Sequence, residues 1–176
     1  MFVAVDVGHL LAAAQEVDKL ALLADGSTLD GPRMQALVAD AARFDVFRLL
    51  DATLNGQPAQ VVRMLAGLRA EGAAIPALMG MVVKELQTVA TLARARNFAA
   101  ECKALRVWES KQAVYKRALG KHPPECWQRF LAEAGRVDRI AKGRPRIGEE
   151  STDAWLQLER LLLAMADKGA GRLLAS

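Results

Sequence analysis

Residues 76–96 read PALMGMVVKELQTVATLARAR, and this stretch decides the fold because apolar side chains cover more than one face of the helix it predicts. The apolar positions are Leu78, Met79, Val82, Val83, Leu86, Val89, Leu92 and Ala93. A helix that is apolar over most of its circumference is either central in a bundle or covered on its second side by a partner. We expect this helix to be central. Its most apolar run, 75–83, is followed by Lys84 and Glu85 and is too short to span a bilayer.

Outward from this helix, apolar residues recur at helical spacing in both directions along the chain. The further helices that we expect are 6–24, a second from Pro32, 45–54, 59–70, 110–119 capped by Ser110, 124–142, and one capped by Ser151 or Thr152 with Asp153 in its first turn. Residues 97–107 lack a clear stripe and are expected to be irregular, and Gly169 and Gly171 to open a frayed tail. The predicted fold class is all-α, a bundle of about eight helices.

Composition agrees with a helical bundle. Hydrophobic residues make up 52% and charged residues 25% of the chain, so a packed core is expected and disorder is not. Aromatic residues are only 5%, while Ala and Leu dominate, which favours helices over sheets. The net charge of +4 permits a nucleic-acid partner without demanding one, since ordinary soluble proteins are often as basic.

Motifs that mark common catalytic or cofactor sites are absent from the sequence. It contains no GxxxxGK[ST] or GxGxxG phosphate loop, no HExxH zinc motif and no GxSxG nucleophile motif. Cys102 and Cys126 have no CxxC spacing, and His9 and His122 lie far apart. We therefore expect no cofactor and no metal. The sequence also disfavours an enzyme, including a helical enzyme of an uncharacterised kind. The start of the chain lacks a basic segment of the kind that begins a signal peptide.

Several strings, taken in order, resemble the delta subunits of the bacterial DNA polymerase III clamp loader. They are residues 8–16 (GHLLAAAQE), 40–47 (DAARFDVF), 65–72 (LAGLRAEG), 84–86 (KEL), 107–108 (VW) and 155–161 (WLQLERL). The first resembles a helix of the family's AAA+ lid domain, where ATP-binding relatives place a phosphate-contacting arginine. Leu11 stands at that position and cannot donate to a phosphate, which implies a part without ATPase activity.

The resemblance implies a division of the chain and a set of partners. Residues 1–43 would be part of the AAA+ lid, and residues 44–176 the C-terminal collar domain through which subunits oligomerise. The collar would anchor the subunit in a ring with gamma or tau and delta-prime, so that the sliding clamp can be loaded on primed DNA in the bacterial cytoplasm. The clamp itself would be contacted only through the family's nucleotide-fold domain, which these residues do not include.

Two sets of residues are candidates for these contacts. Apolar residues outside the main helical stripes, Met81, Val89, Leu156 and Leu163, are candidates for the interface with a neighbouring subunit, and internal packing explains each of them equally well. The basic segment 136–146 carries Arg136, Arg139, Lys142, Arg144 and Arg146 against the single acid Asp138.

These cations are candidates to contact primer-template DNA phosphates, although cations near a helix C-terminus are also a dipole preference. The resembled family can present an aromatic residue from the loop at 143–148, which has none here, so only electrostatic contact is expected from it. The basic segment alone leaves open an alternative function, a stand-alone helical module that binds nucleic acid.

Overall fold

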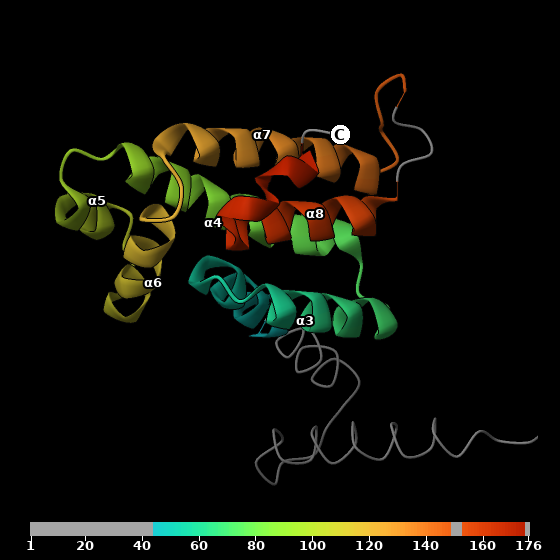
Figure 1. Cartoon of the computed structure of the whole chain (residues 1–176), viewed down its shortest axis with the longest axis horizontal. Helices are drawn as coiled ribbons and strands as arrows, with labels where there is room; N and C mark the ends of the chain where they lie inside the picture. The colour runs from blue at the N-terminus through green and yellow to red at the C-terminus, as the bar shows by residue number, and fades with distance from the viewer. Residues whose placement is uncertain (1–43, 149–152, 175–176) are drawn as a thin grey trace, which may run out of the picture. The chain divides into compact units, whose positions relative to one another are not determined.

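A computed structural model of the chain describes residues 44–148 and 153–174 (Figure 1). Every regular element within these ranges is a helix, and no strand occurs among them, which confirms the predicted all-α fold. Contacts within the chain separate it into two compact units, Met1–Phe44 and Asp45–Ser176, and the second unit is described below. The helices expected at 6–24 and from Pro32 lie outside the described residues, and the division into lid and collar domains stays a prediction.

The second unit is a helical bundle with a short pair of helices at one end. Its elements are the helix at 44–55, of which residues 45–55 belong to this unit, α3 (Pro58–Ala70), α4 (Ile75–Arg94), α5 (Phe98–Ala104), α6 (Glu109–Leu119), α7 (Pro124–Ala141), α8 (Ala154–Ala166) and the 3-10 helix η1 (Lys168–Leu174). The helix α4 packs most extensively on α7, α7 also packs on α8, and α8 packs on α3 (Figure 1). The short helices α5 and α6 lie at one end of the bundle, and the loop after α7 lies at the opposite end (Figure 1).

The helix α4 supplies the largest share of the core. Its buried residues are Ile75, Leu78, Met79, Val82, Leu86, Val89, Ala90 and Leu92. By length and composition alone this 20-residue helix could also cross a membrane, but a core helix that packs on α7 has the same properties. Burial inside the bundle therefore accounts for the apolar stretch at 76–96.

Helix ends follow one recurring pattern. The helices that end at residue 55, at Ala70 and at Ala141 are each followed by a glycine with positive φ, at Gly56, Gly72 and Gly143. At the first of these ends, Gly56 N–H donates to the carbonyl of Thr53 and Gln57 N–H to that of Ala52, both at 3.0 Å. These two bonds form a Schellman motif, which satisfies carbonyls left free at the end of the helix.

Four local predictions were wrong. Residues 98–104 form the helix α5, in which the Asn97 side chain accepts a hydrogen bond of 3.1 Å from Ala100 N–H and so caps its first turn. The helix α6 begins after Trp108, so Ser110 lies inside its first turn. Asp153 is the cap of α8, because its carboxylate accepts a 2.9 Å bond from Trp155 N–H, while Ser151 and Thr152 lie outside the described residues. The expected frayed tail is instead the 3-10 helix η1, within which Gly169 and Gly171 lie.

The turn between α6 and α7 fastens the ends of two other helices. Lys121 Nζ donates a 3.1 Å hydrogen bond to the carbonyl of Leu54, and His122 Nε2 donates a 3.0 Å bond to the carbonyl of Met165. Both acceptors lie in the last turn of their helices, where backbone carbonyls lack an intrahelical partner. Adjacent side chains therefore hold the helix at 44–55 and α8 at the same end of the bundle.

Candidate nucleic-acid interface

The helical part of the predicted basic segment is engaged in contacts within the bundle. Arg136 Nε and Nη2 donate to the carboxylate of Glu133 at 2.5 to 3.0 Å, and Nη2 also donates to Gln157 Oε1 of α8 at 2.5 Å. Arg139 donates to the carbonyl of Gly135 at 3.2 Å. These contacts of Arg136 join α7 to α8, so the side chain has a structural role.

The cations at the end of α7 and in the following loop are exposed. Lys142 is paired with Asp138 one turn earlier, with 2.7 Å between Nζ and Oδ2. Arg144 and Arg146 are exposed, and Ile147 beside them is 100% exposed. The structure thus keeps the loop residues of the predicted set on the surface and adds an apolar side chain to them.

A second exposed feature lies at the corner between α5 and α6. Trp108 is 81% exposed, more than any other aromatic side chain in the described ranges. Leu105, Lys103 and Arg106 are exposed beside it in sequence, and we call residues 103–108 the α5–α6 corner. Exposed aromatic rings next to cations are the arrangement with which proteins stack on unpaired bases and hold the phosphates.

The backbone of this corner is strained at one residue. Arg106 has φ of 54°, and no other non-glycine residue in the described part of the chain has a positive φ. Its N–H donates to the carbonyl of Lys103 at 3.2 Å, and Val107 N–H donates to that of Cys102 at 2.8 Å, as in a Schellman motif. An arginine therefore occupies the position that glycine holds at three other helix ends. Arg106 therefore adopts the left-handed conformation at a steric cost that glycine would not have.

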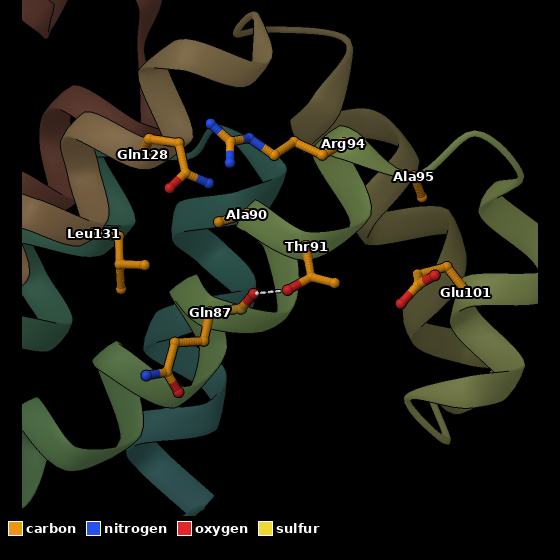
Figure 2. Close-up of a pocket in the computed structure, with 8 residues that line it drawn as sticks. All are labelled: Gln87, Ala90, Thr91, Arg94, Ala95, Glu101, Gln128 and Leu131. Carbon is orange, nitrogen blue, oxygen red and sulfur yellow. Dashed lines mark hydrogen bonds between the residues drawn. The ribbon is translucent and has the colours of Figure 1, made fainter.

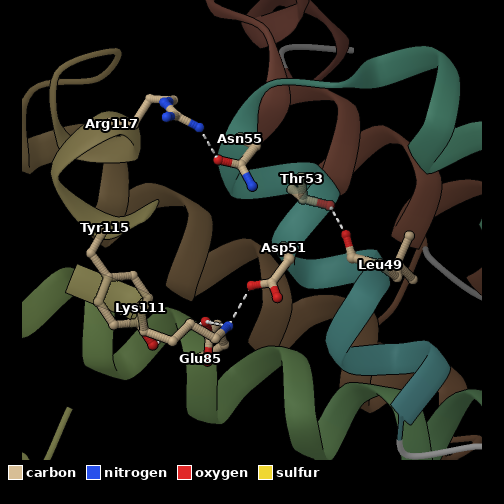
Figure 3. Close-up of polar contacts among 8 residues, drawn as sticks. All are labelled: Leu49, Asp51, Thr53, Asn55, Glu85, Lys111, Tyr115 and Arg117. Atoms are coloured by element: carbon tan, nitrogen blue, oxygen red, sulfur yellow. Dashed lines mark hydrogen bonds and ion pairs between the residues drawn. The ribbon is translucent and has the colours of Figure 1, made fainter. Parts of the chain in front are cut away.

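A polar cluster lies between α6, α4 and the helix at 44–55 (Figure 3). Lys111 Nζ lies 2.6 Å from Asp51 Oδ1 and 3.1 Å from Glu85 Oε1, and the Tyr115 hydroxyl donates to the same Glu85 oxygen at 3.0 Å. Arg117 is hydrogen-bonded to the side chain of Asn55. We call Asp51, Glu85, Lys111 and Tyr115 the Lys111 cluster; it joins the helix at 44–55, α4 and α6.

The environment of the Lys111 cluster shifts two pKa values. Burial alone would lower the pKa of Lys111, but its hydrogen bond with Asp51 and the charge of Glu85 outweigh burial and raise it. Burial, together with the charge of Glu85, raises the pKa of Tyr115 well above its usual range. Lys111 therefore stays protonated and Tyr115 stays a neutral hydrogen-bond donor at neutral pH.

The structure also has an open groove of about 450 Å³ between α4, α5 and α7 (Figure 2). It is lined by Gln87, Ala90, Thr91, Arg94, Ala95, Glu101, Gln128 and Leu131. The Thr91 hydroxyl donates to the Gln87 carbonyl at 2.8 Å, and the lining set includes no histidine or cysteine that could act as a nucleophile or base. Among the described residues, no group of three or more His, Cys, Asp and Glu side chains is placed to hold a metal ion.

Comparison with known proteins gives one curated match, and no protein-family model matches the chain. Over 165 residues the chain is 28% identical to DNA polymerase III subunit delta of Escherichia coli (strain K12). The chain is similar to a DNA polymerase III delta subunit. This finding confirms the resemblance predicted from the sequence.

The similarity to the delta subunit covers 92% of this chain but 46% of the relative, so the chain spans about half the length of the curated protein that it matches. The aligned stretch must therefore include most of the helical bundle. What the delta subunit does as a whole protein comes to this chain only as a proposal.

The apolar residues predicted to meet a neighbouring subunit differ in exposure. Val89 is fully buried in α4, so it packs internally, which is the alternative that the sequence left open. Met81 and Leu163 are partly buried and pack against the core. Leu156 on α8 is 44% exposed and is the one member of the set that presents a large apolar surface.

Trp108 is the residue that sequence reasoning missed as a candidate site. The dipeptide Val107-Trp108 is visible in the sequence, but no apolar stripe tells which tryptophan is exposed. Trp127 is fully buried and Trp155 is partly buried, although all three occur beside helical stretches. One signal for the exposure of Trp108 was available in the sequence. Residues 97–107, which precede it, show no apolar stripe, so Trp108 does not continue the buried face of a long helix.

Proposed function

We propose that this chain is the C-terminal part of a bacterial clamp-loader delta subunit, which anchors the subunit in a collar ring with gamma or tau and delta-prime. The observation that supports this most is the similarity to a delta subunit along 92% of the chain. In this role the chain itself catalyses no reaction. It helps to load the sliding clamp on primed DNA in the cytoplasm, as one part of a DNA polymerase holoenzyme.

The bundle suits a part that assembles rather than reacts. The residues that line its groove include no histidine or cysteine, and the polar side chains of Arg136 and Lys111 join helices to one another. An apolar anchor surrounded by polar groups is what a subunit interface requires. Leu156 offers such an anchor on α8, and the partly buried Leu163 lies two turns further along the same helix.

Primer-template DNA is the second proposed partner, at two places on the bundle. At the α5–α6 corner, Trp108 stacks on an unpaired base while Lys103 and Arg106 meet phosphates. At the C-terminal end of α7, Lys142, Arg144 and Arg146 supply electrostatic contact, while Arg136 links α7 to α8. The two surfaces lie at opposite ends of the bundle, because α5 and α6 lie at one end and the loop after α7 lies at the other (Figure 1).

Co-purification tests the assembly role. Tagged chain, mixed with gamma and delta-prime, is expected to retain both proteins at physiological salt concentration, and Leu156→Asp to weaken that retention with the helical circular dichroism unchanged. Retention of neither protein by the wild-type chain would contradict the proposed role in the collar.

The alternative is a stand-alone helical module that binds nucleic acid, and the exposed Trp108 in basic surroundings favours it as a second candidate. A stand-alone module binds DNA at micromolar concentration or tighter without any partner, and the affinity falls steeply with salt. A collar part needs neighbouring subunits to bind DNA tightly. Titrations of fluorescent primed DNA with the chain alone, and then with gamma and delta-prime present, distinguish the two.

A further inference from the structure

The helix α6, which begins directly after Trp108, is held in place largely by polar contacts. Only Tyr115 and Ala118 of its 11 residues are buried. By comparison, α8 buries seven residues in 13. Because apolar burial is the main stabilising term in packing, α6 depends more than α8 on specific hydrogen bonds for its position.

Lys111 supplies those bonds at the end of α6 that carries Trp108. Its Nζ bridges the carboxylates of Asp51 and Glu85, which belong to two different helices (Figure 3). The Lys111 side chain is 23% exposed and that of Glu85 12%, so solvent screens this pair less than a surface ion pair. Tyr115, one turn later, donates to the same Glu85 oxygen.

Lys111 is also tied directly to the exposed tryptophan. The backbone N–H of Lys111 donates a 2.9 Å hydrogen bond to the carbonyl of Trp108, which joins the residue before α6 to the first turn of the helix. The residue whose side chain is held by two carboxylates is therefore also the residue whose backbone holds the Trp108 carbonyl.

We propose that the Lys111 cluster positions Trp108 for nucleic-acid contact, an inference that rests on the proposed DNA-binding role. Asp51, Glu85, Lys111 and Tyr115 are positioning residues that touch no nucleic acid themselves. They hold the backbone that carries the ring in one place relative to α4 and to the helix at 44–55. A base that stacks on the ring then requires less ordering of the protein than it would on a mobile turn.

The negative charges of Asp51 and Glu85 allow a positioning role to be distinguished from a purely electrostatic effect on DNA binding. Asp51 and Glu85 are acids, so removing either one makes the chain more positive and, by charge alone, tightens binding to DNA. Positioning predicts the opposite sign, because the loss of a carboxylate releases Lys111. Asp45 lies on the same helix as Asp51 but outside the cluster, so Asp45→Ala is a control with the same change in charge.

The test measures the affinity of the full 176-residue chain, assembled with gamma and delta-prime, for fluorescent primed DNA. Asp51→Ala is expected to weaken binding about fivefold, Glu85→Ala by a similar factor, and Asp45→Ala to leave it unchanged or tighter. The backbone ¹⁵N NOE of Trp108 in the isolated chain is expected to fall in Asp51→Ala and to stay constant in Asp45→Ala. Because the Asp51 side chain is 42% exposed, its loss is expected to leave the bundle folded, and circular dichroism checks this.

Trp108→Ala separates failure of this inference from failure of the proposed DNA contact. If Trp108→Ala weakens binding but Asp51→Ala and Glu85→Ala bind as tightly as wild type or tighter, the positioning role is overturned while the DNA contact stands. If Trp108→Ala binds as tightly as wild type, the proposed contact at the α5–α6 corner is itself wrong.

Discussion

Lys121 Nζ donates a hydrogen bond of 3.1 Å to the carbonyl of Leu54, across 67 positions of the sequence. The donor lies in the turn before α7, and the acceptor lies at the end of the helix at 44–55. The same ammonium group fills the space where a side chain on Gly56 would stand, with Lys121 Cε 2.9 Å from the ideal Cβ position. Glycine at 56 therefore serves two purposes, the positive φ of the turn and the close approach of Lys121.

The first prediction compares two glycines with nearly the same φ. Gly56 and Gly72 have φ of 77° and 76°, but a Cβ on Gly72 meets nothing within 4 Å. Gly72→Ala is expected to lower the free energy of unfolding by about 1 kcal/mol, through backbone strain alone. Gly56→Ala is expected to cost about 1 kcal/mol more, since it also displaces Lys121. Urea denaturation measures both, and equal losses would show that the contact with Lys121 contributes nothing.

The second prediction concerns the strain at Arg106. Replacing this residue by glycine is expected to raise the free energy of unfolding by about 1 kcal/mol, because glycine adopts positive φ without steric cost. The same substitution removes a cation beside Trp108 and is expected to weaken DNA binding. Urea midpoints and DNA titrations check the two effects separately. A variant that is less stable than wild type would contradict the assignment of strain to this position.

The third prediction concerns the dependence of stability on pH. His122 is 5% exposed, and its ring makes edge contacts with those of Trp127 and Phe130. Burial, assisted by the charges of Lys121 and Lys168, lowers the pKa of His122 below its ordinary value of 6.5 despite the bond to Met165. The unfolded chain therefore takes up the proton first as pH falls. Stability is expected to be complete above pH 6.5 and to decline below it.

His122→Gln provides the control for that pH dependence. Glutamine keeps an N–H that can donate to the Met165 carbonyl but does not titrate, while the other histidine, His9, is unchanged. The difference in free energy of unfolding between wild type and variant is expected to change between pH 7.5 and pH 5.5, values chosen about one unit either side of the ordinary histidine pKa. A constant difference across that range would exclude His122 as the source.

The fourth prediction separates the apolar residues of α8. Leu163→Asp is expected to lower the free energy of unfolding by about 2 kcal/mol or more, since Leu163 packs against the core. Leu156→Asp replaces a 44% exposed side chain and is expected to change stability by less than about 1 kcal/mol while weakening the binding of gamma. Thermal unfolding and pull-down measure these quantities. Undiminished binding of gamma by Leu156→Asp would exclude this residue from the interface.

The sequence was sufficient for the long helices because their apolar residues repeat over many turns. The predicted helix 124–142 matches Pro124–Ala141 to within one residue at its end.

Short elements were not predicted, for a physical reason. The seven residues of α5 complete too few turns to show a stripe, and their helix depends on the Asn97 cap. Ser151, Thr152 and Asp153 are all good caps, so composition alone could not choose among them.

The candidate site was harder to predict because exposure and pairing depend on tertiary contacts. The pair between Arg136 and Glu133, three positions apart, follows from helical spacing, but the bond from Arg136 to Gln157 joins residues 21 positions apart. That bond removes Arg136 from the set of surface cations. Similarly, nothing local to Lys111 shows that Asp51, 60 positions earlier, lies within 2.6 Å of it.

Assembly with gamma and delta-prime is tested most directly by sedimentation velocity of the fluorescently labelled chain. In the presence of both unlabelled proteins the chain is expected to move at the rate of the complete assembly, with one copy in each complex. The Leu156→Asp variant is expected to shift back towards the rate of the free chain. A wild-type chain that sediments unchanged at micromolar concentrations of both partners would contradict its place in the collar.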